Sequence, residues 1–215
     1  DLNTFDASKP KLFCPYPLFD NFGEPITKTE AYEKLGLAIN EEYILFFGFI
    51  RDYKGLDLLL HAMADERVRN LNMKLIVAGE FYTDAKPYAE MIQQLGIKDK
   101  LILKTDFIPD NEVRNYFCAA DIVVQPYTHA TQSGVTQICY HFNKPMLVTN
   151  VGGLPEIVPH GKVGYVVSPD PKAIADALID FYANHLEFKM RDNIKIEKKK
   201  YAWSEMLNKI FEIQN

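Results

Sequence analysis

Short apolar runs alternate with helical patterns along most of this chain, and this alternation limits the fold more than any other feature. The runs are rich in Val, Ile, Leu and Phe and lack polar alternation, which is typical of parallel strands covered on both faces. Alternating strand and helix signals predict an α/β fold with a doubly wound parallel sheet. The predicted strands cover residues 43–47, 73–78, 101–104, 122–125, 146–149 and 165–167.

The helical patterns between these runs divide the chain into three parts. Asp110 is the predicted N-cap of one helix, and Asp170, followed by Pro171, is the predicted N-cap of another. Residues 1–40 read as an extended lead-in and a short helix, 41–188 as the α/β domain, and 189–215 as a helical tail. The predicted helices lie near 28–35, 56–66, 84–95, 110–120, 134–143 and 154–158, and the chain beyond 171 is wholly helical.

Charge and hydropathy exclude several classes of protein. The chain has 215 residues and a formal net charge of -5, which argues against a dedicated nucleic-acid binder, because such proteins cluster Lys and Arg. No apolar run reaches the ~18–20 residues that span a bilayer. The first residues lack the basic region and apolar core of a signal peptide. We therefore expect a cytoplasmic protein, and the absence of an initial Met indicates a fragment of a longer one.

Two predicted strand-to-helix junctions carry anion-binding features. The first runs from Gly48 to Gly55 and contains Arg51 and Lys54, two cations three residues apart. The second runs from Thr131 to Gln137 and opens a helix, whose free backbone N–H groups and dipole favour an anion. Together they predict a diphosphate pocket. The alternatives are that the two cations are surface residues and that Thr131 or Ser133 only caps the helix.

Two further loops follow predicted strands at the same edge of the sheet. Gly79 and Glu80 come after the second strand, and Gly152 and Gly153 come after the fifth. Each is equally explained as a turn without a ligand. Because doubly wound sheets bind ligands beyond the carboxyl ends of their strands, the coincidence of four such loops favours a binding cleft.

Taken in order, these pieces resemble the C-terminal, donor-binding domain of the GT-B glycosyltransferases of family 4, the retaining group 1 enzymes. The matching region covers roughly residues 43–168. The fold that this resemblance implies is one Rossmann-like half of a GT-B protein. The matching pieces are Gly48 with Lys54-Gly55-Leu56-Asp57, Val77-Ala78-Gly79, Asp106-Phe107-Ile108-Pro109, Asp121-Ile122-Val123, Lys144-Pro145, Gly152-Gly153-Leu154-Pro155-Glu156 and Gly161 with Gly164-Tyr165.

The resemblance also implies roles for particular residues. Lys54 matches the family's diphosphate-binding lysine, and Arg51 lies two residues from the position of the family's arginine. The chain has no glutamates where the family has two, so Gln137 is the best substitute for the ribose contact. The implied catalytic residues are Arg51 and Lys54; the implied donor-binding residues are Gly48, Glu80, Phe107, Ile108, Thr131, Gln132, Ser133, Gly134 and Gln137.

The resemblance implies transfer of a sugar from a nucleoside-diphosphate-sugar to an acceptor, with no metal or other cofactor in the site. It also implies that the acceptor-binding half, an N-terminal domain of the same protein, is missing and that the isolated chain is inactive. Two alternatives remain: a non-catalytic sugar-nucleotide-binding domain, and a GT-B-like epimerase or phosphorylase.

A basic stretch at residues 189–200 has two interpretations. It is either a solvated helix face or a contact with anionic lipid headgroups, at the inner face of the membrane. Its cations are Lys189, Arg191, Lys195, Lys198, Lys199 and Lys200.

Overall fold

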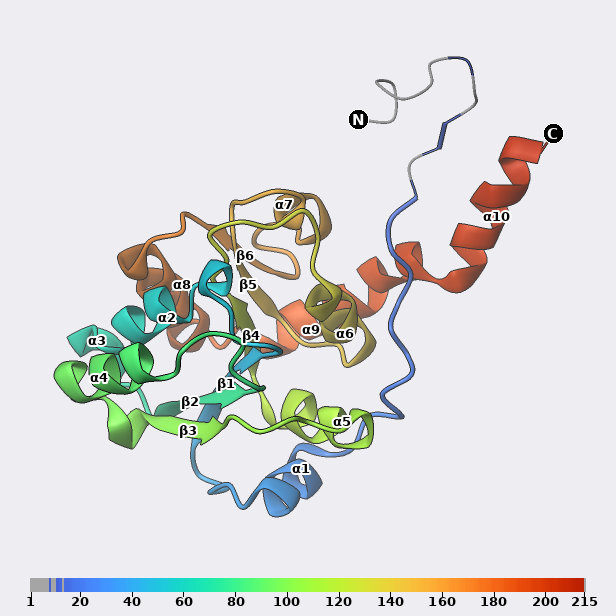
Figure 1. Ribbon diagram of the computed structural model, residues 1–215. Coiled ribbons are helices and arrows are strands. Elements are labelled where there is room, and N and C mark those ends of the chain that lie inside the picture. Colours follow the sequence, from blue (N-terminus) through green and yellow to red (C-terminus); the bar gives the residue numbers. More distant parts are fainter. Residues whose placement is uncertain (1–7, 9–10, 13, 215) are drawn as a thin grey trace.

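A parallel sheet flanked by helices on both faces forms the body of the protein, as the computed structural model in Figure 1 shows. The structure describes residues 8, 11–12 and 14–214. The strands are β1 (Glu42–Phe47), β2 (Met73–Ala78), β3 (Leu101–Lys104), β4 (Ile122–Gln125), β5 (Met146–Thr149) and β6 (Gly164–Val167). They are ordered β3-β2-β1-β4-β5-β6. The predicted α/β class and parallel sheet are confirmed.

Two layers of helices bury the faces of this sheet. The helices are α1 (Lys28–Leu35), α2 (Leu56–Met63), α3 (Glu66–Arg69), α4 (Lys86–Leu95), α5 (Asp110–Ala119), α6 (Gly134–His141), α7 (Leu154–Ile157), α8 (Pro171–Ala183), α9 (Glu187–Glu197) and α10 (Trp203–Gln214). One core contains side chains of α2, α4 and α8, and the other contains those of α1, α5 and α6. Strand side chains alternate between the two cores, so Ile44 and Phe46 face one and Tyr43 and Leu45 the other.

The strand order reverses between β1 and β4, because β2 and β3 lie on one side of β1 and β4 to β6 on the other. In a doubly wound sheet, this switch point opens a crevice at the carboxyl ends of the strands. Both predicted anion-binding junctions follow the two strands that meet there, β1 and β4.

Two local predictions about helix ends are wrong. Pro109, with an extended backbone, precedes α5, and Asp110 is the first helical residue rather than the N-cap. The predicted helix over 56–66 ends at Met63, because Asp65 leaves the helical conformation and its carboxylate accepts a hydrogen bond from the Arg67 N–H to begin α3. The Asp170 prediction is confirmed, since its side chain accepts from Ala173 N.

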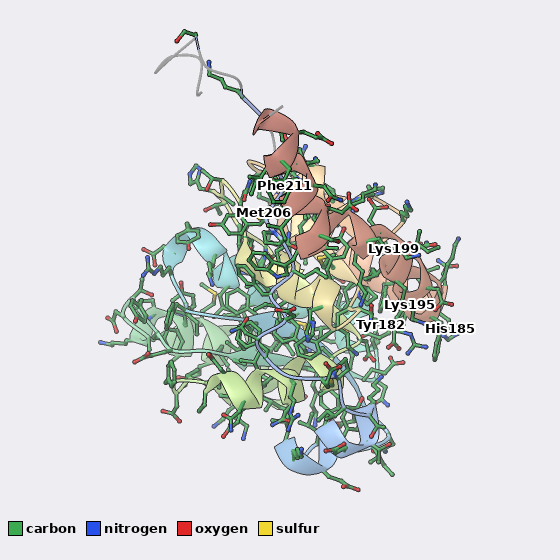
Figure 2. The ribbon with its side chains drawn as sticks, turned by 90° about the vertical axis from the view of Figure 1, so that its right-hand side faces the viewer. Tyr182, His185, Lys195, Lys199, Met206 and Phe211 are labelled. Carbon is green, nitrogen blue, oxygen red and sulfur yellow. The ribbon has the colours of Figure 1, made fainter. Side chains whose placement is uncertain are left out.

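The lead-in crosses the α6 side of the body and joins the C-terminal helices. Leu18 N donates to the Tyr201 carbonyl, at 2.9 Å, and a His141 ring nitrogen lies 2.8 Å from the Gly23 carbonyl oxygen. Parts of the predicted lead-in, 1–7, 9–10 and 13, lie outside the described residues. In Figure 1 α10 extends away from the sheet, and Figure 2 shows its Met206 and Phe211 beyond Lys195 and Lys199.

Candidate diphosphate site

The two predicted junctions lie against each other at the switch point. Thr128 N donates to the Tyr53 carbonyl at 2.8 Å, and a Cβ at Gly55 would collide with the Pro126 carbonyl. The sequence predicts that the two junctions form one pocket, and the structure joins them by backbone contacts. The two loops therefore form one wall of the crevice.

Lys54 is the most unusual charged residue in this wall. It ends a short 3₁₀ turn, Asp52–Lys54, and only 9% of it is exposed. Its ammonium lies over Gly48, where a Cβ would come within 2.8 Å of Nζ, and Gly48 also has a φ of +98° that favours glycine. No carboxylate among the described residues forms an ion pair with it, so the positive charge is buried without an anionic partner.

The surroundings of Lys54 make its charged form unfavourable. Burial, and next the nearby charge of Arg51, lower the pKa of the Lys54 ammonium to about 8. Proteins rarely bury a cation without compensation, because desolvation costs several kcal/mol for an ion (about 3–5 kcal/mol when a partner is removed). An anion bound here would supply the missing compensation.

Tyr127 connects Lys54 to the start of α6. The Lys54 ammonium lies 5.7 Å from the centre of the Tyr127 ring, within cation–π range. The Tyr127 hydroxyl lies 3.3 Å from Ser133 Oγ, which accepts a hydrogen bond from Val135 N and so caps α6. The predicted capping role of Ser133 is confirmed. The patterns did not single out Tyr127; its position after Pro126 at a strand end was the available signal.

A recess of about 680 Å³ opens beside this wall. We call it the loop recess, and it faces the predicted junction residues Thr131 and Gln132 and the loop after β5. Gly153 N donates to the Thr131 carbonyl at 3.0 Å, which ties the β5 loop to the β4 loop. Its lining residues are Tyr53, Thr128, His129, Ala130, Thr131, Gln132, Val151 and Gly152.

A second recess, of about 300 Å³, lies on the lead-in side of α6. We call it the lead-in recess. Two predicted donor-binding residues, Gly134 and Gln137, line it at the first turns of α6. Of the residues in the loop recess, it shares only Gln132. Its lining residues are Tyr16, Phe19, Gln132, Ser133, Gly134, Gln137 and Ile157.

The remaining predicted site residues lie outside both recesses. Arg51 is exposed, and its guanidinium stacks 5.0 Å from the centre of the Tyr82 ring. Glu80 is exposed, and its backbone carbonyl accepts from Ile50 N at 2.8 Å. Phe107 is 64% exposed, and Ile108 packs against the core. The structure thus brings together Gly48, Lys54 and residues 131–137, with Arg51 at the rim.

No metal-binding cluster of three or more His, Cys, Asp or Glu side chains occurs within the part of the chain that the structure describes. None of the helices in that part is both long and apolar enough to cross a bilayer.

Comparison with known proteins places this geometry in a family. The family model for glycosyl transferases group 1 matches residues 41–184, more than half of the chain. A D-inositol 3-phosphate glycosyltransferase of Corynebacterium efficiens is 32% identical over 67% of this chain and 35% of its own length. An uncharacterised glycosyltransferase of Methanocaldococcus jannaschii is 29% identical over 82% of this chain and 45% of its own. The chain therefore spans less than half the length of these curated relatives.

Solved structures agree on the fold. Anabaena HepE in complex with UDP-glucose aligns with a TM-score of 0.78 at 19% identity, over 91% of this chain and 55% of that one. The C-terminal domain of a group 1 glycosyl transferase, LpcC of Francisella tularensis, aligns with a TM-score of 0.74 at 21% identity, over 86% of this chain and 97% of that domain. This chain has the Rossmann-like fold of a GT-B C-terminal domain and belongs to the group 1 glycosyltransferases.

Proposed function

We propose that this chain is the nucleotide-sugar-binding half of a retaining glycosyltransferase. The observation that carries the proposal is the buried ammonium of Lys54, which has no carboxylate partner among the described residues and lies at the switch point of the sheet. Such a charge is stabilised when a diphosphate enters beside it.

The diphosphate would lie between Lys54 and the start of α6. Lys54 supplies a full positive charge, and the start of α6 supplies the positive end of its dipole. Arg51 at the rim adds a second cation once a ligand draws its guanidinium from the Tyr82 ring. Thr131 and Gln132 line the loop recess on one side, and Gln132, Ser133 and Gly134 line the lead-in recess on the other.

In the reaction, the bond between the anomeric carbon and the diphosphate oxygen breaks and a bond from that carbon to an acceptor hydroxyl oxygen forms, while the hydroxyl proton passes to the departing nucleoside diphosphate, on which negative charge develops. Lys54, Arg51 and the start of α6 stabilise that charge without a metal ion. Groups fixed in place before the reaction lower its barrier. In other enzymes, removing one such hydrogen-bond donor raises the barrier by about 3–4 kcal/mol.

The acceptor is bound by the rest of the longer protein. The chain spans less than half the length of its curated relatives, which supports assigning acceptor binding to a second domain. The isolated chain should therefore bind a sugar nucleotide but transfer nothing. HepE was solved with UDP-glucose, which makes UDP-sugars the first ligands to test.

Isothermal titration calorimetry with UDP-, GDP- and ADP-sugars tests the proposal. We expect one of the three nucleotide classes to bind with a dissociation constant below about 1 mM, or about -4 kcal/mol. Absence of heat with all three up to millimolar concentrations would sink the proposal. Product analysis of the full-length protein, with the best-binding donor, then tests transfer and retention of the anomeric configuration.

One observation favours a second candidate, a non-catalytic sugar-nucleotide-binding domain. No carboxylate lines either of the two recesses, and the lead-in recess contains Gln137, the implied substitute for the family's ribose contact. This candidate predicts donor binding without transfer or donor hydrolysis by the full-length protein. Detectable turnover of the bound donor would exclude it.

We further propose that the protein works in the cytoplasm, with residues 189–200 near the inner face of the membrane. Lys195 and Lys199 lie on one side of the tail in Figure 2. Lys195 pairs with Asp192 and Lys200 with Glu197, which reduces the free charge of the stretch. Sedimentation with anionic and with neutral vesicles tests this contact, and equal recovery with both would leave a solvated helix face.

A further inference from the structure

Helix α9 lies along the amino edge of the sheet, where the strands begin. Near its start, Glu187 Oε2 lies 3.9 Å from Lys28 Nζ, and the ion-pair partner of Lys28 is Asp121, which directly precedes β4. At its end, Glu197 Oε2 lies 2.6 Å from the ammonium of Lys162, which shortly precedes β6. The candidate diphosphate site follows the carboxyl ends of the strands, so α9 covers the opposite edge.

The inward side of α9 is fixed by packing. Met190 belongs to the core that contains α2, α4 and α8, and Ile194 to the core that contains α1, α5 and α6. A helix that reaches both cores spans the edge of the sheet between them. Asn193 also donates to the Lys162 carbonyl at 2.9 Å. These contacts hold the outward side of α9 in one orientation.

The outward side of α9 combines exposed apolar side chains with cations. Phe188 and Ile196 are 62% and 63% exposed. Lys195 and Lys199, the latter in the turn that continues α9, are exposed beside them, since positions three, four, seven and eight residues apart share one face of a helix. Figure 2 shows both lysines on one side of the tail. We call these four residues the α9 face.

The charge of this segment is opposite to that of the rest of the chain. Residues 188–200 contain six Lys or Arg and two Asp or Glu, a net charge of +4, whereas the whole chain carries -5, so the remainder carries -9. Asp192, the exposed one of the two carboxylates, pairs with Lys195 at 2.8 Å. Lys189 and Lys199 form no ion pair with any residue that the structure describes. A cationic surface on an anionic protein favours an anionic partner.

The neighbouring helix α10 does not share this chemistry. It also exposes apolar side chains, Trp203 and Leu207 among them, but its exposed polar residues include Glu205 and Glu212. A helix that lies on an anionic bilayer has Lys and Arg beside its apolar residues, because carboxylates are repelled there. The α9 face fits such a bilayer, and α10 does not.

We propose that the α9 face docks on an anionic lipid bilayer, with its lysines on the headgroups and the side chains of Phe188 and Ile196 inserted between them. This inference rests on the proposed contact of residues 189–200 with the membrane, to which it adds two apolar anchors and an orientation. Because α9 covers the amino edge, the crevice at the carboxyl edge stays open to solvent in the docked protein.

Two kinds of variant separate the anchors from the charges. Phe188→Ala combined with Ile196→Ala removes both anchors, and since both side chains are mostly exposed, this double variant should fold like the parent. Leu207→Ala is its matched control, because Leu207 is 50% exposed but lies on α10. Lys199→Gln removes a charge from the α9 face, and Lys86→Gln removes one from an exposed lysine on α4.

The experiment is sedimentation with vesicles of phosphatidylcholine alone and with vesicles that contain about one third phosphatidylserine. We expect the parent to bind the mixed vesicles at least about tenfold more tightly, and the double variant to lose about tenfold of that affinity. Lys199→Gln should lose about fivefold, and both controls should bind like the parent. At ~0.5 M salt, where the charges are screened, the parent should retain weak binding that the double variant lacks.

The contrary results separate this inference from the proposals on which it rests. Equal recovery of the parent with both vesicles would overturn the membrane contact altogether, in favour of an acidic protein partner or a solvated face. A double variant that sediments like the parent, or a Leu207→Ala variant that is weakened as much, would overturn the anchors and leave a purely electrostatic contact. UDP, or the best-binding nucleotide, should bind within about twofold of its free affinity on mixed vesicles, since the crevice stays open. Loss of nucleotide binding on the vesicles alone would overturn the orientation, whereas a parent that binds no nucleotide even without vesicles would contradict the proposed function.

Discussion

The ammonium of Lys54 lies 5.7 Å from the centre of the Tyr127 ring, at the junction of the two loops that follow β1 and β4. The lysine is buried beside this ring and has no carboxylate partner among the described residues. This pair of residues joins the two halves of the candidate diphosphate site, because the Tyr127 hydroxyl also contacts Ser133 at the start of α6.

The depressed pKa of Lys54 predicts how nucleotide binding depends on pH. With a pKa of about 8, Lys54 is mostly charged at pH 7 and increasingly neutral above pH 8. Affinity for UDP, or for the best-binding nucleoside diphosphate, should therefore fall by up to about tenfold between pH 7 and 9. Calorimetry across this range measures the slope. Lys54→Met should show a nearly flat profile, and an equal slope in both proteins would contradict the assignment.

The same pKa predicts that the folded chain becomes more stable as the pH rises, whereas nucleotide affinity falls. Lys54 has a lower pKa in the folded chain than its ordinary value of 10.5, so the unfolded chain binds more protons between pH 8 and 10.5. The free energy of unfolding should rise across that window by at most about 3 kcal/mol from this group. Lys54→Met should be more stable than the parent at pH 7, and the difference should shrink toward pH 10.5. Urea unfolding at several pH values tests this; a less stable variant at pH 7 would be inconsistent with an uncompensated charge.

Tyr127 should contribute mainly through its ring. Tyr127→Phe keeps the ring beside Lys54 and loses the contact with Ser133 Oγ, which still accepts from Val135 N. We expect a loss of about 1 kcal/mol in stability and little change in nucleotide affinity. Tyr127→Leu removes the ring as well, and should weaken the nucleotide severalfold. Equal affinities of the Phe and Leu variants would show that the ring does not position Lys54.

Arg51 should matter less than Lys54 and depend more on salt. Its side chain is exposed and stacked on Tyr82, so its interaction with a diphosphate is screened, whereas that of Lys54 is shielded from solvent. Arg51→Ala should reduce affinity by about threefold to tenfold at low salt, and by less at ~0.3 M salt, where the Debye length is shorter. Titrations at two salt concentrations test this order. A larger effect for Arg51→Ala than for Lys54→Met would reverse the roles.

A partly exposed ion pair at the opposite edge of the sheet supplies a control for folding. Lys28 pairs with the almost fully buried Asp121, which also accepts a hydrogen bond from Tyr43 N at 2.8 Å. Lys28→Met leaves the carboxylate buried without this partner, and because 38% of the Lys28 side chain is exposed to solvent, we expect a cost of about 1 kcal/mol of stability. Nucleotide affinity should not change in the folded variant. Chemical unfolding and calorimetry together test this; weaker binding at full folding would mean that the two edges are coupled.

Local sequence signals were sufficient for the sheet and for the two loops that form the wall of the candidate site. The buried strands were visible because runs without polar alternation are specific to a sheet covered on both faces. Lys54, Ser133 and Gln137 were predicted because strand ends and helix starts are recognisable from short patterns. The break in the helix over 56–66 was missed, since Asp65 both ends one helix and caps the next.

The rest of the site depends on contacts between distant parts of the chain. Phe19 contacts Gly134 across more than a hundred residues, and Tyr127 contacts Lys54 from a different strand. Neither contact produces a periodicity or a fixed spacing in the sequence, so no sequence pattern predicts it. Arg51 was placed correctly in its loop, but its stacking on Tyr82 depends on the short bridge between Ile50 and Phe81.

The most direct test compares Lys54→Met with Lys86→Met, which makes the same charge change at an exposed lysine on α4. Both variants and the parent are titrated with the best-binding nucleoside diphosphate at pH 7. We predict that Lys54→Met weakens binding at least tenfold, the value expected for a lost charge-assisted contact of about 1.5–3 kcal/mol, and that Lys86→Met binds like the parent. A Lys54→Met protein that is folded and binds as tightly as the parent would contradict the account.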